Sequence, residues 1–123
     1  MPVIRTLVVD DSPLFLFTIV RFLELIPNLT VVGSAASGVE ALEQANRLRP
    51  DLVVLDLEMP QMNGLVAARL LKAREDAPYI IMLSMHGDSA YRALAAEAKA
   101  DIFVAKKDAD TELVPAIERL FAL

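Results

Sequence analysis

Short runs of apolar, largely β-branched residues alternate along the chain with amphipathic stretches of about a dozen residues. The runs are apolar throughout, a pattern typical of strands that are buried on both faces of a parallel sheet. Five strand–helix pairs predict an α/β fold, a doubly wound (βα)5 three-layer sandwich with a parallel sheet in the flavodoxin-like order 2-1-3-4-5. Strands are predicted over 3–9, 30–35, 52–55, 79–83 and 102–105, and helices over 13–26, 38–48, 64–75, 88–99 and 111–122.

Local signals support several helix boundaries. Ser12 precedes Pro13, which predicts an N-cap followed by proline at the first helical position. Ser37 and Glu40 have the spacing of a capping box at the start of the second helix. Pro115 falls inside the last predicted helix, where it is expected either to remove one backbone hydrogen bond or to move the helix start later.

Length and charge limit the possible functions. The chain has 123 residues and a formal net charge of -5, so we expect one domain over residues 1–123. The acidic balance argues against binding of nucleic acid or an anionic membrane by this domain itself. The chain contains no cysteine, which excludes disulfides, thiolate metal sites and cysteine catalysis.

The mean hydropathy of +0.46 raises the question of a membrane segment. The most apolar stretch, residues 14–20, ends at Arg21 and is far shorter than the roughly 18 residues that a span requires. Aspartates at positions 10 and 11 do not fit a secretory signal. We therefore expect a soluble, cytoplasmic protein.

Polar side chains occur where the predicted strands end. Asp10 and Asp11 follow the first strand, Asp56 the third, Ser84 the fourth and Lys106 the fifth. Open α/β sheets bind ligands beyond the carboxyl ends of their strands, at the point where the strand order reverses. Strands 1 and 3 are neighbours in the predicted order, so we expect the three carboxylates to converge there.

This set of groups fits phosphoryl chemistry. Clustered carboxylates repel one another unless a hard cation lies between them, and Mg²⁺ prefers such oxygen ligands. A carboxylate can attack phosphorus to form an aspartyl phosphate. A lysine and a hydroxyl would then stabilise the oxygens of the transferred group.

The motifs together resemble the CheY-like receiver domain of two-component response regulators. They are DD at 10–11, D-x-x-M-P-x-M-x-G at 56–64, LS at 83–84 and K at 106. The resemblance covers residues 4–120. The stretches 27–42, 49–60 and 80–88 resemble receivers attached to helix-turn-helix output domains in particular.

Residue by residue, the resemblance implies that Asp56 is the phosphoacceptor and a ligand of Mg²⁺. Asp11 is implied as a direct metal ligand, and Asp10 as a ligand acting mainly through water. Glu58 occupies the position whose backbone carbonyl completes the metal site. Glu58 and His86 lie two residues beyond Asp56 and Ser84, where they flank the phosphoryl group and can affect its lifetime. For His86 the favoured interpretation is a partly exposed loop residue, with an effect on dephosphorylation as the alternative.

The resemblance also implies a switch. Ser84 matches the hydroxyl that moves to the phosphoryl group, and Phe103 the aromatic residue whose rotation reports activation; Tyr91 is the less favoured aromatic for that role. Lys106 matches the lysine that pairs with the phosphoryl group, although Lys107 could compete for it. Alternation from Phe103 favours Lys106.

The first predicted helix has unusual outward positions. If Phe15, Ile19, Phe22 and Leu23 form its buried face, the outward residues include Leu16, Phe17 and Val20. In the receiver family this helix is where the histidine kinase or phosphotransfer protein binds. The three residues are therefore a candidate docking surface, with coverage by the last helix as the alternative.

The resulting expectation is a response regulator receiver. It would accept a phosphoryl group from a phosphohistidine on a sensor kinase or phosphotransfer protein. It would then change the affinity of the face formed by helix 4, strand 5 and helix 5 for a downstream protein. Such a domain promotes its own phosphorylation and dephosphorylation but turns over no external substrate. The resemblance leaves a homodimer open.

There are four alternatives, three of them from other classes of protein. The chain could be a truncated receiver of a DNA-binding regulator, with a stand-alone protein slightly favoured, or an interaction domain that is never phosphorylated. A haloacid-dehalogenase-like phosphatase needs a D-x-D motif at the first strand, whereas this strand ends in DDS. A dinucleotide-binding module needs G-x-G-x-x-G there, which the sequence does not have.

Overall fold

A computed structural model of the chain describes residues 3–59 and 62–122. Five parallel strands form one sheet in the order β2-β1-β3-β4-β5, which confirms the predicted fold class. The strands are β1 Ile4–Val9, β2 Leu29–Ala35, β3 Leu52–Asp56, β4 Tyr79–Ser84 and β5 Ile102–Ala105. The helices are α1 Pro13–Leu23, α2 Gly38–Leu48, α3 Gly64–Lys72, α4 Ser89–Glu97 and α5 Ala109–Phe121, with a short 3₁₀ turn at Lys106–Asp108.

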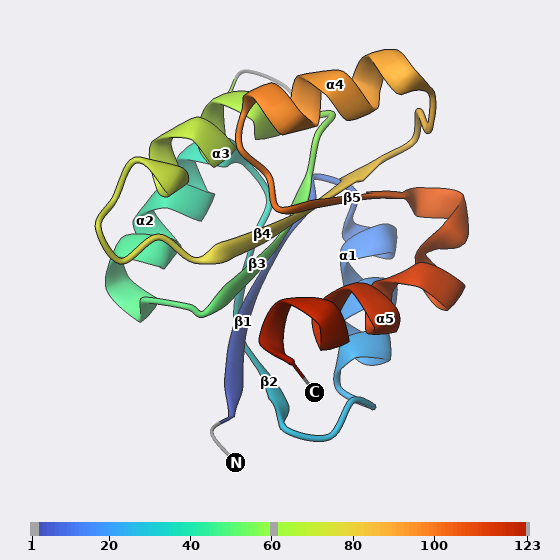
Figure 1. Cartoon of the computed structure of the whole chain (residues 1–123). Coiled ribbons are helices and arrows are strands. Elements are labelled where there is room, and N and C mark those ends of the chain that lie inside the picture. Colours follow the sequence, from blue (N-terminus) through green and yellow to red (C-terminus); the bar gives the residue numbers. More distant parts are fainter. Residues whose placement is uncertain (1–2, 60–61, 123) are drawn as a thin grey trace.

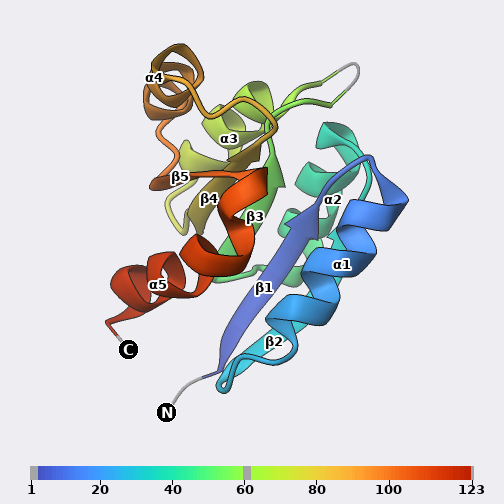
Figure 2. The same cartoon turned by 90° about the vertical axis from the view of Figure 1, so that its right-hand side faces the viewer.

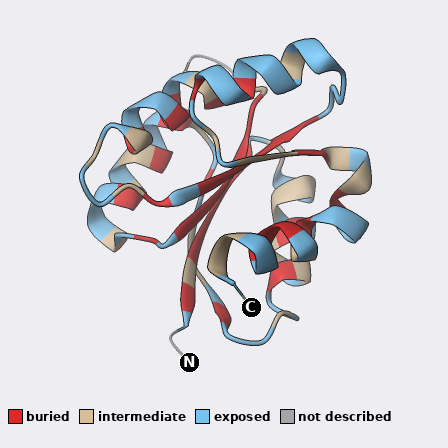
Figure 3. Ribbon diagram, in the orientation of Figure 1, coloured by how far each residue is buried: buried red, intermediate tan, exposed pale blue. Residues whose placement is uncertain are grey.

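The helices cover both faces of the sheet. α1 and α5 lie on one face and α2, α3 and α4 on the other, as Figures 1 and 2 show from two directions. The central strands are buried along almost their whole length (Figure 3). This explains why their sequences are apolar at every position.

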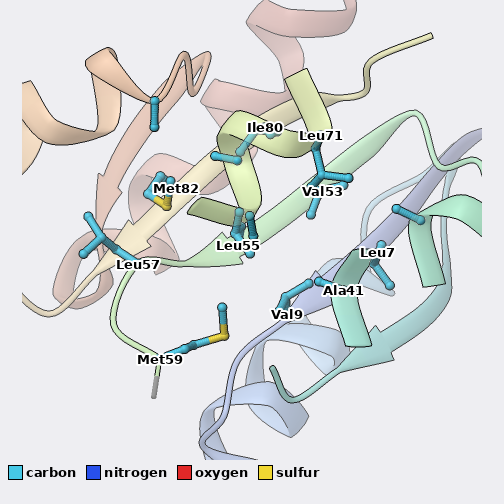
Figure 4. Close-up of a cluster of buried hydrophobic side chains, with 14 of the residues drawn as sticks. Leu7, Val9, Ala41, Val53, Leu55, Leu57, Met59, Leu71, Ile80 and Met82 are labelled. Atoms are coloured by element: carbon cyan, nitrogen blue, oxygen red, sulfur yellow. The ribbon is translucent and has the colours of Figure 1, made fainter. Parts of the chain in front are cut away.

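Each face of the sheet has its own hydrophobic core. The core beneath α2, α3 and α4 contains buried side chains from β1, β3 and β4 together with Leu57 and Met59 from the loop after β3 (Figure 4). The core beneath α1 and α5 is formed around Ile19, Leu23, Leu113 and other side chains from those helices and the strands. The sheet is thereby fixed on both sides, which holds its carboxyl edge in place.

Helix ends differ from the predicted ones by a few residues. α1 ends at Leu23, because the amides of Leu25 and Ile26 bond three residues back, to Phe22 and Leu23, and so tighten into 3₁₀-like turns. Of the two effects expected of Pro115, a later start of the last helix does not occur. α5 begins at Ala109, directly after the 3₁₀ turn, and contains Pro115. The predicted capping hydrogen bonds are present at Ser12 and Ser37.

The outward face of α1 is narrower than predicted. Phe17 is 61 % exposed and Leu14 is 77 % exposed. Leu16 and Val20 are half-buried and pack against the core beneath α1 and α5, so the expectation that they point outward is wrong. Along the described chain, no helix has the length and apolar character needed to cross a membrane.

Candidate functional site

The carboxyl edge of the sheet brings the predicted polar residues together. Val9 of β1 pairs with Leu55 of β3, so Asp10 and Asp56, the next residues, leave the sheet side by side. Ser84 ends β4, and Lys106 directly follows β5. The parallel register of four adjacent strands therefore places these side chains at one edge. Pro60 and Gln61 of the motif at 56–64 lie outside the described residues.

Three carboxylates form the centre of the site. Asp10, Asp11 and Asp56 each offer an oxygen that lies within 4.8 Å of the others. Asp10 and Asp56 are buried, whereas Asp11 is exposed. Such close like charges are unfavourable unless cations compensate them.

Lys106 provides one compensating charge. Its Nζ lies 2.9 Å from Asp10 Oδ2 and 3.2 Å from Asp56 Oδ1. The same ammonium lies 4.4 Å from the centre of the Phe15 ring, and this cation–π contact covers the ammonium on the side of α1. Lys107 is exposed, so the structure places Lys106, and not its neighbour, against the carboxylates.

Burial controls the ionisation of Asp56. Loss of solvation raises its pKa to about 7, and the neighbouring charge of Asp10 adds to this effect, although Lys106 acts in the opposite direction. For Lys106, burial alone would lower the pKa. Its contacts with Asp10 and Asp56 outweigh burial and raise the pKa above its ordinary value. The lysine is therefore charged at neutral pH.

The oxygens of these carboxylates are oriented in a way that suits a cation. Asp10 Oδ1 accepts a hydrogen bond from the Ser12 N–H (2.8 Å), and Asp56 Oδ1 accepts one from the Glu58 N–H (3.2 Å). Asp56 Oδ2 is buried but accepts no hydrogen bond from the described residues. A buried oxygen without a partner beside two other carboxylates fits a hard divalent ion such as Mg²⁺.

One contact at this edge was missed in the sequence. Both oxygens of the Glu58 side chain accept hydrogen bonds from the end of β4: Oε2 from the Ser84 hydroxyl, and Oε1 from the Met85 N–H at 2.9 Å. Sequence reasoning assigned Glu58 a role for its backbone carbonyl and for lifetime only. The signal that could have indicated the contact is the position of Glu58, two residues beyond Asp56, just after β3, which is the neighbour of β4 in the sheet.

The loop after β4 connects the site to α4. The His86 ring stacks on Tyr91, with centroids 4.5 Å apart. The Arg92 guanidinium lies 4.7 Å from the centre of the half-buried Phe103 ring, and its Nε donates to the Gly87 carbonyl (3.1 Å). Arg92 thus links Phe103 of β5 to the loop that follows Ser84.

A cavity of about 460 Å³ opens at the site, and Asp11, Asp56, Glu58 and Lys106 are among its lining residues. Its rim includes exposed apolar side chains, Leu14 (77 %) and Met85 (72 %). The floor carries three carboxylates and one ammonium, so a small anionic group would fit there only together with a cation.

Comparisons with known proteins agree on one family. A family model described as response regulator receiver domain matches residues 6–118. A protein-glutamate methylesterase/protein-glutamine glutaminase of Alkalilimnicola ehrlichii is 44 % identical over 108 residues, which cover 87 % of this chain but 28 % of that relative. The chain thus spans little more than a quarter of that relative's length.

Solved structures agree with the sequence comparisons. The response regulator domain of Thermotoga maritima CheB superposes with a TM-score of 0.88 at 30 % identity, covering 98 % of both chains. A LuxR-family two-component response regulator from an Aurantimonas species gives a TM-score of 0.91 at 36 % identity, covering 98 % of this chain and 86 % of that one. The similarity includes receivers from regulators of different kinds.

Proposed function

The chain belongs to the response regulator receiver domain family, and we propose that it is a phosphorylation-dependent switch whose acceptor is Asp56. The donor is a phosphohistidine on a sensor histidine kinase or a histidine phosphotransfer protein. The observation that most supports this proposal is the clustering of buried Asp56, with its unpartnered Oδ2, beside two carboxylates and the Lys106 ammonium. Such a domain transmits a signal and turns over no external substrate.

In the transfer, a carboxylate oxygen of Asp56 attacks phosphorus. The bond from phosphorus to the imidazole nitrogen of the donor breaks, and its electron pair leaves on that nitrogen. The Lys106 ammonium, 3.2 Å from Asp56 Oδ1, is placed to balance the charge on the phosphoryl oxygens. It also keeps part of the Asp56 population ionised against the effect of burial.

Asp10, Asp11 and Asp56, with the backbone carbonyl of Glu58, are the groups that would hold Mg²⁺. The ion supplies positive charge that offsets the carboxylates and the phosphoryl oxygens. Exposed Asp11 can adjust to a ligand most freely, whereas the Ser12 N–H holds Asp10 in position.

Activation moves Ser84 and Phe103 and changes the face formed by α4, β5 and α5. The Ser84 hydroxyl turns to the phosphoryl group, and Phe103, half-buried under Arg92, changes rotamer. The change is a shift between two populations of one fold. A downstream protein then binds this face with altered affinity.

The phosphodonor docks beside α1. Phe17 is the exposed member of the predicted docking set, and Leu14 and Met85 extend the apolar surface to the rim of the cavity. Leu16 and Val20 support this surface from below. The protein works in the cytoplasm, without binding nucleic acid or membrane through this domain, and either alone or as a homodimer.

Two other functions share the same fold. The domain could be the receiver part of a longer regulator, with a DNA-binding or a methylesterase output, or an interaction domain that is never phosphorylated. Formation of a phosphoryl adduct on Asp56 would support a receiver, either alone or as part of a longer regulator, and would exclude an interaction domain that is never phosphorylated.

A further inference from the structure

The side chain of Glu58 is held at the site by its neighbours. Leu57 is 5 % exposed and Met59 is 7 % exposed, and both pack into the core beneath α2, α3 and α4 (Figure 4). Because these two flanking residues are anchored there, Glu58 is directed toward the end of β4, where it is half-buried. Its position is therefore set by packing of the loop and not by chance contact at the surface.

The Glu58 carboxylate uses both of its oxygens. One accepts from the Ser84 hydroxyl and the other from the Met85 N–H at 2.9 Å. Ser84 is fully buried, and its oxygen also accepts from the His86 N–H (3.0 Å). The Ser84 hydroxyl proton and the Met85 N–H are thus both already used in hydrogen bonds to Glu58.

A carboxylate in this position imitates a phosphoryl group. Each presents anionic oxygens that only accept hydrogen bonds. Glu58, Asp56, Lys106 and Met85 line the same cavity, so a group bonded to Asp56 would share that space with the Glu58 side chain. Two anions close together in a partly buried cavity also repel each other.

We propose that the Glu58 carboxylate is an internal competitor of the phosphoryl group, occupying the Ser84 and Met85 donors until phosphorylation displaces it. The inference rests on the proposed function and adds a regulatory role for this side chain. When an oxygen of Asp56 bonds to phosphorus and the donor's leaving group departs with the electron pair, the new phosphoryl oxygens have Lys106 beside them. Ser84 and Met85 become available only when Glu58 turns out toward the open cavity. Glu58 therefore favours the unphosphorylated arrangement of the loop after β4.

The experiment measures the affinity for beryllofluoride, a phosphoryl mimic, in the presence of Mg²⁺ by amide NMR titration of the full chain. Glu58→Ala removes the competing carboxylate but keeps the backbone carbonyl. In wild type the hydrogen bonds to this carboxylate stabilise only the free protein and must be broken before beryllofluoride binds. Without them, we expect beryllofluoride to bind about tenfold more tightly. Glu58→Asp keeps the charge, but its shorter side chain withdraws the oxygens from Ser84 and Met85. It should show most of the same gain. Glu75→Ala, which removes an exposed carboxylate in the loop after α3, is the matched control and should bind like wild type.

The Met85 amide reports the contact directly. Without beryllofluoride, its proton resonance should move upfield in Glu58→Ala and Glu58→Asp, because the bond to a carboxylate is lost; a general loss of stability would not produce this selective shift. Unchanged or weaker beryllofluoride binding in both variants would overturn the inference. Tighter binding in Glu58→Ala alone, with wild-type behaviour in Glu58→Asp, would also overturn it, by assigning the effect to charge. If folded wild type and every variant fail to bind beryllofluoride, the proposed function itself fails.

Discussion

Lys106 and Asp56 meet across an intervening strand. Asp56 ends β3 and Lys106 follows β5, with β4 between them, yet Lys106 Nζ lies 3.2 Å from Asp56 Oδ1. The same Nζ is 2.9 Å from Oδ2 of Asp10, the residue that directly follows β1. One ammonium therefore spans the carboxyl edge of four strands and reaches both buried carboxylates.

Replacement of Lys106 by methionine is expected to slow phosphoryl transfer from acetyl phosphate about a hundredfold, the size of effect seen when one electrostatic contact to a reacting group is removed. Loss of the ammonium also removes the charge that counteracts the raised pKa of Asp56. The rate is measured by chromatographic separation of the phosphorylated chain over time. Lys107→Met alters an exposed lysine and should react like wild type. Equal rates for wild type and Lys106→Met would contradict the assigned role.

Mg²⁺ should stabilise the fold. At ten times its dissociation constant, a ligand that binds only the native state adds about 1.4 kcal/mol, which corresponds to a rise in Tm of roughly 5 °C for a domain of this size. Asp11→Ala should abolish this rise but not lower the metal-free Tm, because Asp11 is exposed and its removal relieves repulsion among the three carboxylates. Thermal unfolding followed by circular dichroism, with Glu75→Ala as control, provides the comparison. A full Mg²⁺ effect in Asp11→Ala would contradict the ligand assignment.

The raised pKa of Asp56 predicts a pH-dependent cost of folding. Its pKa of about 7 in the folded state lies above the ordinary value of 3.8. The group's favourable contribution is therefore complete below about pH 3.8 and is lost as the pH rises through 7. Asp56→Asn, which carries no charge, should exceed wild type in unfolding free energy by roughly 2 to 4 kcal/mol at pH 8, and by about 2 kcal/mol less at pH 5.

Urea unfolding in the presence of a chelator measures this difference at the two pH values. The chelator matters because a bound cation would stabilise the ionised carboxylate. Asp51→Asn, an exposed carboxylate at the other end of β3, serves as the control and should show no comparable gain at pH 8. If the difference between Asp56→Asn and wild type were the same at pH 5 and pH 8, the pKa of Asp56 would not be raised in the folded state.

Most of the fold could be predicted from the sequence because the strands are apolar on both faces and the helices have capped starts. The positions of Asp10, Asp56, Ser84 and Lys106 at one edge followed from the strand order alone. Backbone directions at helix ends were not predictable, because whether the turn after Leu23 tightens depends on local hydrogen bonds.

Side-chain pairing was harder to predict than position. Glu58 was correctly placed beside the site, but its bonds to Ser84 and Met85 depend on the anchoring of the loop after β3 in the core. The half-burial of Leu16 and Val20 likewise depends on how far the side chains of the core beneath α1 and α5 extend around the sides of α1. Periodicity assigns residues to a face of a helix, whereas its neighbours determine the width of the buried stripe.

Docking on α1 is tested by Phe17→Glu. Phe17 is 61 % exposed, so the change should not disturb the core. We expect at least tenfold slower transfer from a phosphorylated histidine phosphotransfer protein, because a charge would replace a central apolar contact, and an unchanged rate from acetyl phosphate. Val39→Glu, a comparably exposed apolar residue on α2, is the control for surface charge. Equal loss with both donors would mean that Phe17 acts on the site and not on docking.

The proposed function depends above all on Asp56 accepting the phosphoryl group. The most direct measurement is the intact mass of the full chain after incubation with acetyl phosphate, with and without Mg²⁺, for wild type and Asp56→Asn. We expect a gain of one phosphoryl group, roughly 80 Da, in wild type with Mg²⁺ and none in Asp56→Asn or without the ion. An adduct of the same mass in Asp56→Asn, or no adduct in folded wild type with Mg²⁺, would contradict the proposed function.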